Sequence, residues 1–555
     1  MTQFYFDKHR ETLEKAVEAS RTREFWSPYP EAPSGKIYGE EAPADGEKAF
    51  KARLNQPFSL EMPGITGEIG AERSPYGFDL GIRYPNVDPE QLLSAMERSL
   101  KAWRDAGAEE RAGICLEILN RLNKRSFELA HAVMHTTGQA FPMAFQAGGT
   151  HAQDRGLEAV AYAYEAMTRH PGQTHWTKPQ GKRDPLEMDK TFYVVPRGLA
   201  MMIGVSTFPT WNGYPGLFAS LATGNPVVVK PHPQTILPLA ITVETCQEVL
   251  KEAGFDPWIV SMVADTAEAP VTKELALDQR IQVIDFTGSS AFGEWLEQNC
   301  HQAQVYTEKA GVNGIVIDST DNLKAMCQNL AFSLSLYSGQ MCTTPQNLFI
   351  QRDGIDTDQG HLSFDEVAQA LADGVTRFLS DNDRATAVLG AIQAPVTAER
   401  IEESKKLGRV VLDSEAREHQ QFDGARIRTP LMLAVDAADE DAYQRELFGP
   451  VSLLIATNDT GDSIERARQL ARRKGAMTWA VYSTSEQVLA DMREAALDAG
   501  VSLSENLLGG VFVNQTAAFS DYHGTGANPA ANAALCDAAF VANRFRVVQT
   551  RRHAA

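Results

Sequence analysis

A single cysteine lies among small residues in the stretch Ser338-Gly339-Gln340-Met341-Cys342-Thr343-Thr344. Small neighbours let the backbone come close to a bound carbonyl group, and a cysteine thiolate is a strong nucleophile. Cys342 therefore has the surroundings of a nucleophile that bonds to a carbonyl carbon. The alternative is an inert buried thiol, which is the commoner role of a free cysteine.

Two other side chains supply what such a nucleophile needs. Asn212 lies in the Pro- and Gly-containing loop FPTWNGYP at residues 208–215, and its amide can donate to a developing oxyanion. Glu308 follows the strand-like residues 305–307 and opens the loop EKAGVN, where a carboxylate can activate water. Taken alone, Asn212 also suits an ordinary turn and Glu308 a solvated surface. Together they favour the catalytic interpretation of Cys342.

The segment FTGSSAFG at residues 286–293 lies between an expected strand and an expected helix. Free backbone N–H groups and the helix dipole at such a junction favour a bound phosphate. The common dinucleotide fingerprint G-x-G-x-x-G is absent after every early strand. Small residues before a helix also serve as caps, so the segment indicates a phosphate site only together with other motifs.

Bulk composition limits the class of protein. The 555 residues carry a formal net charge of −20, which argues against nucleic acid or an anionic membrane as a partner. Six scattered cysteines without a C-x-x-C pair argue against structural zinc, and no metal site is predicted. The charged N-terminus lacks an apolar signal core, and no apolar run approaches a membrane span, so a cytoplasmic protein is expected.

Strands and helices are expected to alternate along most of the chain. Strands at 227–230, 259–263 and 282–286 are separated by helices at 235–253 and 268–275, which predicts a parallel α/β sheet. Ligands of such sheets bind beyond the carboxyl ends of the strands. A second α/β region is expected from Gly314, with strands at 314–317, 347–351, 451–456 and 480–482.

Three segments are expected outside these sheets. Residues 1–90 open with a helix and continue as an irregular arm on the surface, punctuated by Pro and Gly. Residues 191–195 and 199–206 are expected as strands across Pro196-Arg197-Gly198, and a hairpin there predicts an assembly arm. Residues 543–550 alternate polar and apolar side chains, as in an edge strand.

The order of these motifs resembles the aldehyde dehydrogenase superfamily over about residues 90–550. The matching segments are TWNGYP, ATGNPVVVKP, FTGSSAFG, EKAGVN, SGQMC and ELFGPV. The resemblance implies that Cys342 attacks an aldehyde, that Asn212 and the Cys342 backbone N–H hold the oxyanion, and that Glu308 activates water to release the acid. It also implies a set of residues that bind a nicotinamide cofactor, namely Trp211, Lys230, His232, Gly288, Ser289, Glu446 and Phe448.

The same resemblance implies the architecture: a Rossmann-type cofactor domain, an α/β catalytic domain and a β oligomerisation arm. The expected boundaries are an N-terminal extension at 1–90, a cofactor domain at 91–313 and a catalytic domain at 314–520. The expected arm combines residues 176–197 with 521–555, and it implies a homodimer or a dimer of dimers.

Two departures from the family pattern bear on specificity. Many NAD-specific members carry a glutamate where this chain has Pro233, and its loss removes repulsion against a 2′-phosphate that Lys230 and His232 can hold. The sequence therefore favours NADP as the cofactor, ahead of NAD. The usual Pro-Phe-Gly-Gly loop is replaced by FSDYHGTGANP at residues 519–529, which argues against a simple alkanal as substrate.

The variant loop, the long N-terminal segment and KPHPQT together resemble the phenylacetic-acid degradation branch, the PaaN type, in its form without a fused hydratase domain. That resemblance implies a CoA-linked semialdehyde as substrate. Three alternatives stay open: a CoA-acylating enzyme or acyl reductase, a catalytically silent scaffold, and a cysteine hydrolase. The hydrolase is disfavoured because no histidine is evidently paired with Cys342.

Overall fold

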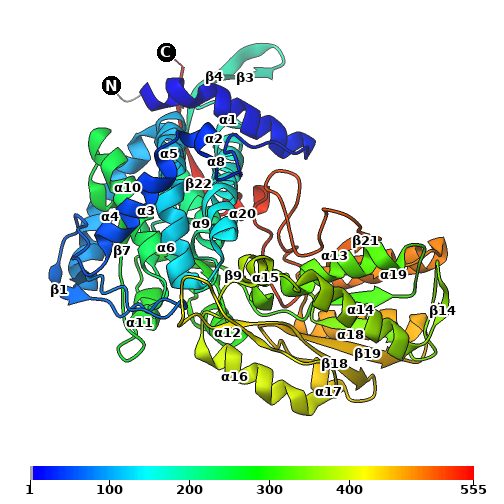
Figure 1. The fold of residues 1–555 in the computed structure, drawn as a ribbon. Helices are drawn as coiled ribbons and strands as arrows, with labels where there is room; N and C mark the ends of the chain where they lie inside the picture. Colours follow the sequence, from blue (N-terminus) through cyan, green and yellow to red (C-terminus); the bar gives the residue numbers. More distant parts are fainter. Residues whose placement is uncertain (1–3, 555) are drawn as a thin grey trace.

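The computed structural model describes residues 4–554, which fold into two lobes with a β-hairpin projecting from the first (Figure 1). The first lobe contains a parallel five-stranded sheet in the order β7-β6-β5-β8-β9, and the second a seven-stranded sheet in the order β15-β18-β19-β12-β10-β20-β21. This is the aldehyde dehydrogenase-like α/β architecture that the motifs imply, with one Rossmann-like sheet and one mixed sheet.

The strands of the first sheet are mostly buried. They are β5 (Leu199–Ile203), β6 (Val227–Lys230), β7 (Val260–Met262), β8 (Ile281–Thr287) and β9 (Gln304–Glu308). Burial on both faces explains the continuous valines of β6, because helices cover both sides of a parallel sheet. The strands predicted at 227–230, 259–263 and 282–286 are thus confirmed. The helix predicted at 235–253 is α10 (Leu237–Glu252), and the helix predicted at 268–275 is α11 (Thr272–Leu277).

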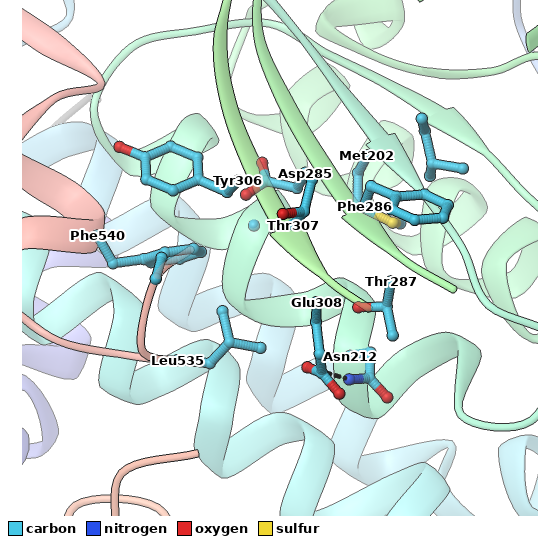
Figure 2. Close-up of a pocket in the computed structure, with 13 residues that line it drawn as sticks. Met202, Asn212, Asp285, Phe286, Thr287, Tyr306, Thr307, Glu308, Leu535 and Phe540 are labelled. Carbon is cyan, nitrogen blue, oxygen red and sulfur yellow. Dashed lines mark hydrogen bonds between the residues drawn. The ribbon is translucent and has the colours of Figure 1, made fainter. Parts of the chain in front are cut away.

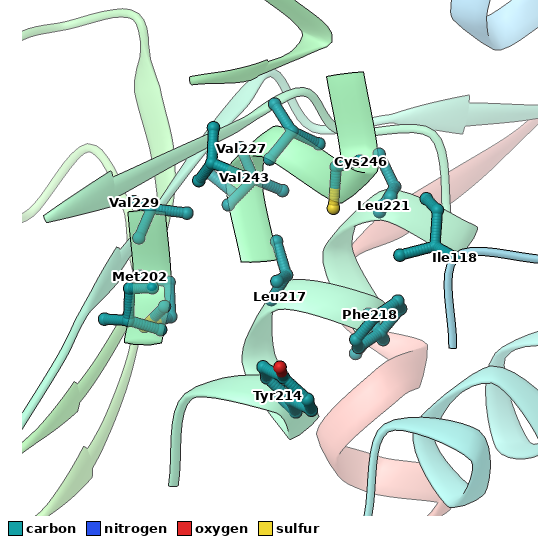
Figure 3. Packing of buried hydrophobic residues seen from close by; sticks show 14 of the residues in the cluster. Ile118, Met202, Tyr214, Leu217, Phe218, Leu221, Val227, Val229, Val243 and Cys246 are labelled. Atoms are coloured by element: carbon teal, nitrogen blue, oxygen red, sulfur yellow. The ribbon is translucent and has the colours of Figure 1, made fainter. Parts of the chain in front are cut away.

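Helices α9 (Pro209–Ala222) and α10 pack their apolar side chains on this sheet (Figure 3). Leu217 and Phe218 of α9 and Val243 of α10 meet Val227 and Val229 in one fully buried cluster. The cluster fixes α9 at the carboxyl end of β5, where its first turn carries Trp211 and Asn212.

The second sheet alternates its side chains between two cores. Its parallel strands are β10 (Gly314–Ile317), β12 (Asn347–Gln351), β18 (Leu431–Asp436), β19 (Val451–Thr457), β20 (Thr478–Tyr482) and β21 (Ser502–Glu505), with β15 (Arg409–Leu412) antiparallel at the edge. Ile315 and Ile317 face the core under α13 (Leu323–Ser335) and α14 (Phe364–Phe378). Val316 faces the opposite core under α18 (Thr460–Lys474) and α19 (Glu486–Ala499).

The N-terminal segment is more regular than predicted, and the expectation of a mainly irregular surface arm is wrong. It contains α1 (Phe4–Thr22), α2 (Gly35–Tyr38), α3 (Ala42–Arg53), β1 (Ile65–Ile69) and β2 (Tyr84–Val87). Phe6, Leu13 and Ala16 of α1 are buried in the same core as the first sheet. A Cβ at Gly113 of α5 (Gly107–Lys124) would lie 2.3 Å from the Phe6 backbone nitrogen, so the close α1–α5 contact requires glycine there.

The remaining elements connect and cover these sheets. The helices are α4 (Pro89–Asp105), α6 (Ser126–Thr137), α7 (Phe141–Phe145), α8 (His151–Thr168), α12 (Ser290–Asn299), α15 (Asn382–Leu389), α16 (Pro395–Ser404), α17 (Glu440–Tyr443) and α20 (Ala538–Ala542). The short strands are β11 (Ser319–Thr320), β13 (Ile355–Thr357), β14 (Gly360–Leu362), β16 (Ala416–Arg417) and β17 (Ile427–Arg428).

The projecting arm is a three-stranded antiparallel sheet in the order β22-β4-β3. Its strands are β3 (Gln173–Gln180), β4 (Arg183–Pro196) and the C-terminal β22 (Phe545–His553), which confirms the predicted edge strand near 543–550. The hairpin turns at Gly181, not at Pro196–Gly198: residues 191–195 belong to β4, whereas 199–203 form β5 of the first sheet. Within residues 4–554, no helix is long and apolar enough to cross a membrane.

Candidate active site

Cys342 follows a buried turn whose backbone is unusual. Helix α13 ends at Ser335, and Tyr337, Ser338 and Gly339 then take positive φ angles of 52°, 48° and 63°. Residues other than glycine adopt such backbone angles only where surrounding contacts impose them. The Ser338 hydroxyl donates to the Leu389 and Arg428 carbonyls at 3.1 and 3.2 Å, and Tyr337 is fully buried. The nucleophile is therefore presented on a rigid turn.

Gly339 is required by space as well as by conformation. A Cβ on Gly339 would lie 2.3 Å from the Gly449 carbonyl oxygen, so the turn packs directly on the ELFGPV segment. The neighbouring Gln340 accepts from the Gln393 backbone N–H at 2.9 Å and donates to the Ala391 carbonyl at 3.1 Å. These contacts couple the turn that precedes Cys342 to two loops of the second lobe.

Asn313 fixes the loop on the other side of Cys342. Its amide donates to the carbonyls of Cys342 and Thr344 at 2.7 and 3.0 Å, and its oxygen accepts from the Met477 N–H at 2.8 Å. In the sequence, Asn313 stands out only as the end of the EKAGVN motif. Its role as a positioning residue becomes visible once both loops are placed in space.

Glu308 and Asn212 meet beside the cysteine loop. Glu308 ends β9 and is buried, so the surface alternative for this residue is wrong. The Asn212 amide donates to Glu308 Oε2 at 3.0 Å (Figure 2). Asn212 lies in the first turn of helix α9 rather than in a loop, because Pro209 starts the helix at its first position.

His523 is a member of the site that the sequence prediction missed. Its Nε2 lies 3.5 Å from Cys342 Sγ and 3.1 Å from Glu308 Oε1. The expectation that no histidine is paired with Cys342 is therefore wrong. The two residues are 181 positions apart, and only the C-terminal segment's return to the first lobe brings them together. The sequence signal was the histidine in the loop that departs from the family pattern.

The electrostatics of the site are dominated by burial and by neighbouring carboxylates. Burial and then the Glu308 carboxylate raise the pKa of the Cys342 thiol well above its usual range. Burial also acts to raise the pKa of Glu308, but His523, Cys342 and Asn212 outweigh it, and the net shift is downward. Burial raises the pKa of Glu446 to about 7, with Arg400 opposing it and Glu308 adding to it.

Glu308, Cys342 and His523 are also the one group of His, Cys and acidic side chains within residues 4–554 whose donor atoms lie close enough for a metal ion, within 4.8 Å of one another. The same three groups contact one another directly. The sequence predicts no metal site, and that expectation stays a prediction.

Five of the seven residues implied to bind a cofactor end or follow strands of the first sheet, whereas Glu446 and Phe448 belong to the second lobe. Lys230 ends β6 and is buried, and its Nζ donates to Asp265 Oδ1 at 2.6 Å. His232 follows two residues later, and burial, then Lys230, lower the pKa of its imidazole to about 4. At neutral pH neither side chain offers a free positive charge, because Lys230 is paired and His232 is neutral.

Gly288 and Ser289 form the junction between β8 and α12. Ser289 is the exposed N-cap residue of α12, and its side chain makes no capping hydrogen bond. The first-turn N–H groups of this ten-residue helix are thus available to an anion, which fits the pyrophosphate of a dinucleotide. Trp211 lies on α9 beside the site, and Glu446 and Phe448 lie between α17 and β19.

Comparison with known proteins agrees with this geometry. The sequence model of the aldehyde dehydrogenase family matches residues 79–503, which is more than half of the chain. The chain belongs to the aldehyde dehydrogenase family. It is accordingly an oxidoreductase of the aldehyde dehydrogenase type.

Individual relatives agree with the family assignment. A crystal structure of an NAD-dependent aldehyde dehydrogenase from Burkholderia multivorans is 57% identical and covers 99% of both chains, with a TM-score of 0.98. A 1-pyrroline-5-carboxylate dehydrogenase from Halalkalibacterium halodurans is 25% identical over 68% of this chain and 70% of its own length. A benzaldehyde dehydrogenase [NAD(+)] from Pseudomonas putida is 23% identical over 76% of this chain and 77% of its own length.

Proposed function

We propose that this family member oxidises an aldehyde to the free carboxylic acid with NAD as the oxidant, through a thioester on Cys342. The observation that carries the proposal is the convergence of the Cys342 loop, the buried Glu308 carboxylate and the Asn212 amide at the carboxyl end of the first sheet. Nucleophile, base and oxyanion donor are the three groups that such a reaction needs.

Each step of the proposed reaction is assigned to a particular residue. Cys342 Sγ attacks the aldehyde carbon, and the oxyanion is held by the Cys342 N–H and the Asn212 amide, which has a second hydrogen besides the one on Glu308. A nicotinamide bound here would accept the hydride that the former aldehyde carbon loses, so that this carbon would remain as a thioester on Sγ. Glu308 then takes a proton from water, the water oxygen attacks the thioester, and the acid leaves as Sγ becomes a thiolate.

A small cavity next to Glu308 is large enough for one water molecule, although Cys342 does not line it. This cavity of about 20 Å³ is lined by Glu308, Asn212 and Thr287 (Figure 2). A single water needs roughly 10–15 Å³. The lowered pKa of Glu308 keeps its carboxylate ionised at neutral pH, as a water-activating base requires.

The cofactor is proposed to be held by the residues named from the family pattern. Gly288 and Ser289 would hold the pyrophosphate, Lys230 the adenosine ribose, and Trp211, Glu446 and Phe448 the nicotinamide end. NAD is favoured here over NADP, because the two groups assigned to the 2′-phosphate carry no free charge: Lys230 pairs with Asp265, and His232 is neutral. Pro233 remains the argument for NADP.

The proposed substrate is a CoA-linked semialdehyde of aromatic catabolism, of the phenylacetate type. The support is the variant loop at residues 519–529, which carries His523 into the site. Glu308 argues against the alternative of thioester transfer to CoA, because an ionised base beside the thioester promotes hydrolysis. A silent scaffold would not need three converging catalytic groups.

Assembly and compartment are also proposals. We propose a homodimer or a dimer of dimers built on the β3-β4-β22 sheet, because Tyr193 and Val548 are exposed there on directly paired positions. A reducing compartment such as the cytoplasm suits a catalytic thiol and five further free cysteines.

The deciding experiment follows the absorbance of reduced nicotinamide with NAD or NADP and a panel of semialdehydes, including CoA-linked ones. We expect reduction with NAD to exceed that with NADP by at least about tenfold in kcat/KM, and Cys342→Ala to be inactive. Preference for NADP would overturn the cofactor assignment. Cofactor binding without turnover of any aldehyde would contradict the proposed function.

A further inference from the structure

His523 brings a third titratable side chain to the reacting atoms. Its Nε2 is 3.5 Å from Cys342 Sγ and 3.1 Å from Glu308 Oε1, and its side chain is almost completely buried. One ring nitrogen therefore faces both the nucleophile and the base. The mechanism described above leaves this histidine without a task.

The ring is held in place by backbone and packing contacts. The His523 N–H donates to the Leu535 carbonyl at 3.0 Å, and the Leu535 N–H donates back at 2.9 Å. The imidazole meets the Trp211 indole edge-to-face, with 4.6 Å between ring centroids. Nδ1 has no hydrogen-bond partner among the described residues, so no acid lies behind the ring as in a hydrolase triad.

The chemistry creates a conflict that His523 is placed to resolve. Cys342 must be a thiolate to attack, and Glu308 must be a carboxylate to activate water, yet two adjacent anions in a buried site repel each other. Glu446 adds a further negative charge near the thiol when it is ionised. Arg155, whose guanidinium lies 5.2 Å from the Trp211 ring, is already paired with Glu158.

We propose that His523 is a catalytic residue that accepts the Cys342 thiol proton on Nε2 and lies, as an imidazolium, between the Sγ thiolate and the Glu308 carboxylate. The S–H bond breaks and the Nε2–H bond forms, so the pair stays neutral overall. The proton stays on His523 while the thioester exists, and thioester hydrolysis regenerates the thiolate beside it. This inference rests on the proposed function for its purpose, but its test does not require aldehyde turnover.

The test is the rate at which iodoacetamide alkylates Cys342 as a function of pH, with the modified peptide identified by mass spectrometry. We expect His523→Gln to slow alkylation by about 10- to 10³-fold near neutral pH, and raising the pH to restore the rate. The exposed histidine variant His301→Gln is the matched control and should alkylate at the wild-type rate. An unchanged rate in His523→Gln at every pH would overturn the proposal.

The Glu308→Gln single variant supplies a second test that does not depend on the folding of a His523 variant. Nε2 lies between Sγ and Glu308 Oε1, so the carboxylate stabilises the imidazolium and its removal should slow alkylation. In the His523→Gln background, Glu308→Gln should instead speed alkylation, because without the imidazolium the only remaining effect of the Glu308 carboxylate is to repel the Cys342 thiolate. A faster Glu308→Gln single variant would contradict the proposal. Alkylation that follows these expectations without aldehyde oxidation would leave the role of His523 intact and refute the proposed function alone.

Discussion

Cys342, Glu308 and Asn212 could be named from the sequence because each lies in a short motif whose residue types match one chemical task. His523 could not, because its task depends on a contact with Cys342 across 181 positions. Lys230 and His232 show a second limit of sequence-based prediction, in which the residue type is misleading. Their residue types suggest cations, but burial against Asp265 in one case and burial of the imidazole in the other remove the free charge.

Replacing Glu308 should separate the two halves of the reaction. In Glu308→Gln, hydride transfer can still proceed, but the thioester lacks its base, so we expect one equivalent of reduced nicotinamide and then turnover slower by about 10²- to 10⁴-fold. Rapid-mixing absorbance and the mass of the acylated protein measure this. Glu248→Gln on the exposed face of α10 is the control. Steady turnover of Glu308→Gln at the wild-type rate would refute the assignment of the base.

Glu446 should make stability depend on pH. Its pKa is raised from 4.5 to about 7, so the folded protein binds more protons than the unfolded chain between these values. The contribution of Glu446 to the free energy of unfolding is fully present below its unfolded pKa of 4.5, and it is lost as the pH rises through about 7. We expect Glu446→Gln to gain stability over wild type progressively across that range, by at most about 3 kcal/mol. Thermal melting at a series of pH values checks this, and a constant difference would contradict it.

At the scale of elements, the parallel strands were predictable because buried strands are continuous apolar runs, and β6, β8, β10 and β12 all lie where expected. The left-handed turn at residues 337–339 was not, because Tyr337 and Ser338 do not favour it. Tertiary contacts from Leu389 and Arg428 impose it. The expectation that the strands on either side of Pro196–Gly198 pair with each other is wrong for a related reason: this segment carries the chain from one sheet into another rather than back on itself.

Two glycines allow the turn to be tested with a matched pair. Gly339 and Gly360 both have positive φ, but a Cβ meets backbone only at Gly339. We expect Gly360→Ala to lose about 1–2 kcal/mol of unfolding free energy. Gly339→Ala should lose more and should also lose activity, because the Cys342 loop moves. Denaturant unfolding and aldehyde oxidation measure the two effects, and equal behaviour of the pair would show that the contact with Gly449 is unimportant.

At the scale of the whole molecule, the arm predicts how copies of the chain meet. Tyr193 and Val548 are directly paired across β4 and β22 and are 49% and 51% exposed. Replacing both by lysine should lower the mass measured by light scattering to that of a single chain, because charge opposes burial of this face. Leu497, which is 77% exposed on α19, is the control position for lysine. An unchanged mass in the double variant would exclude this face from the interface.

The segment that leads into β22 also supplies an ion pair that can form only late in protein synthesis. Asp285, in the centre of the first sheet, is paired by the buried Arg544 at 2.7 Å, and 259 positions separate them. A ribosome adding roughly 5–20 residues per second takes about 13–50 s to cover that interval. The nascent first lobe therefore holds Asp285 without this ion pair until Arg544 has been synthesised, and the packing around Asp285 is completed only then.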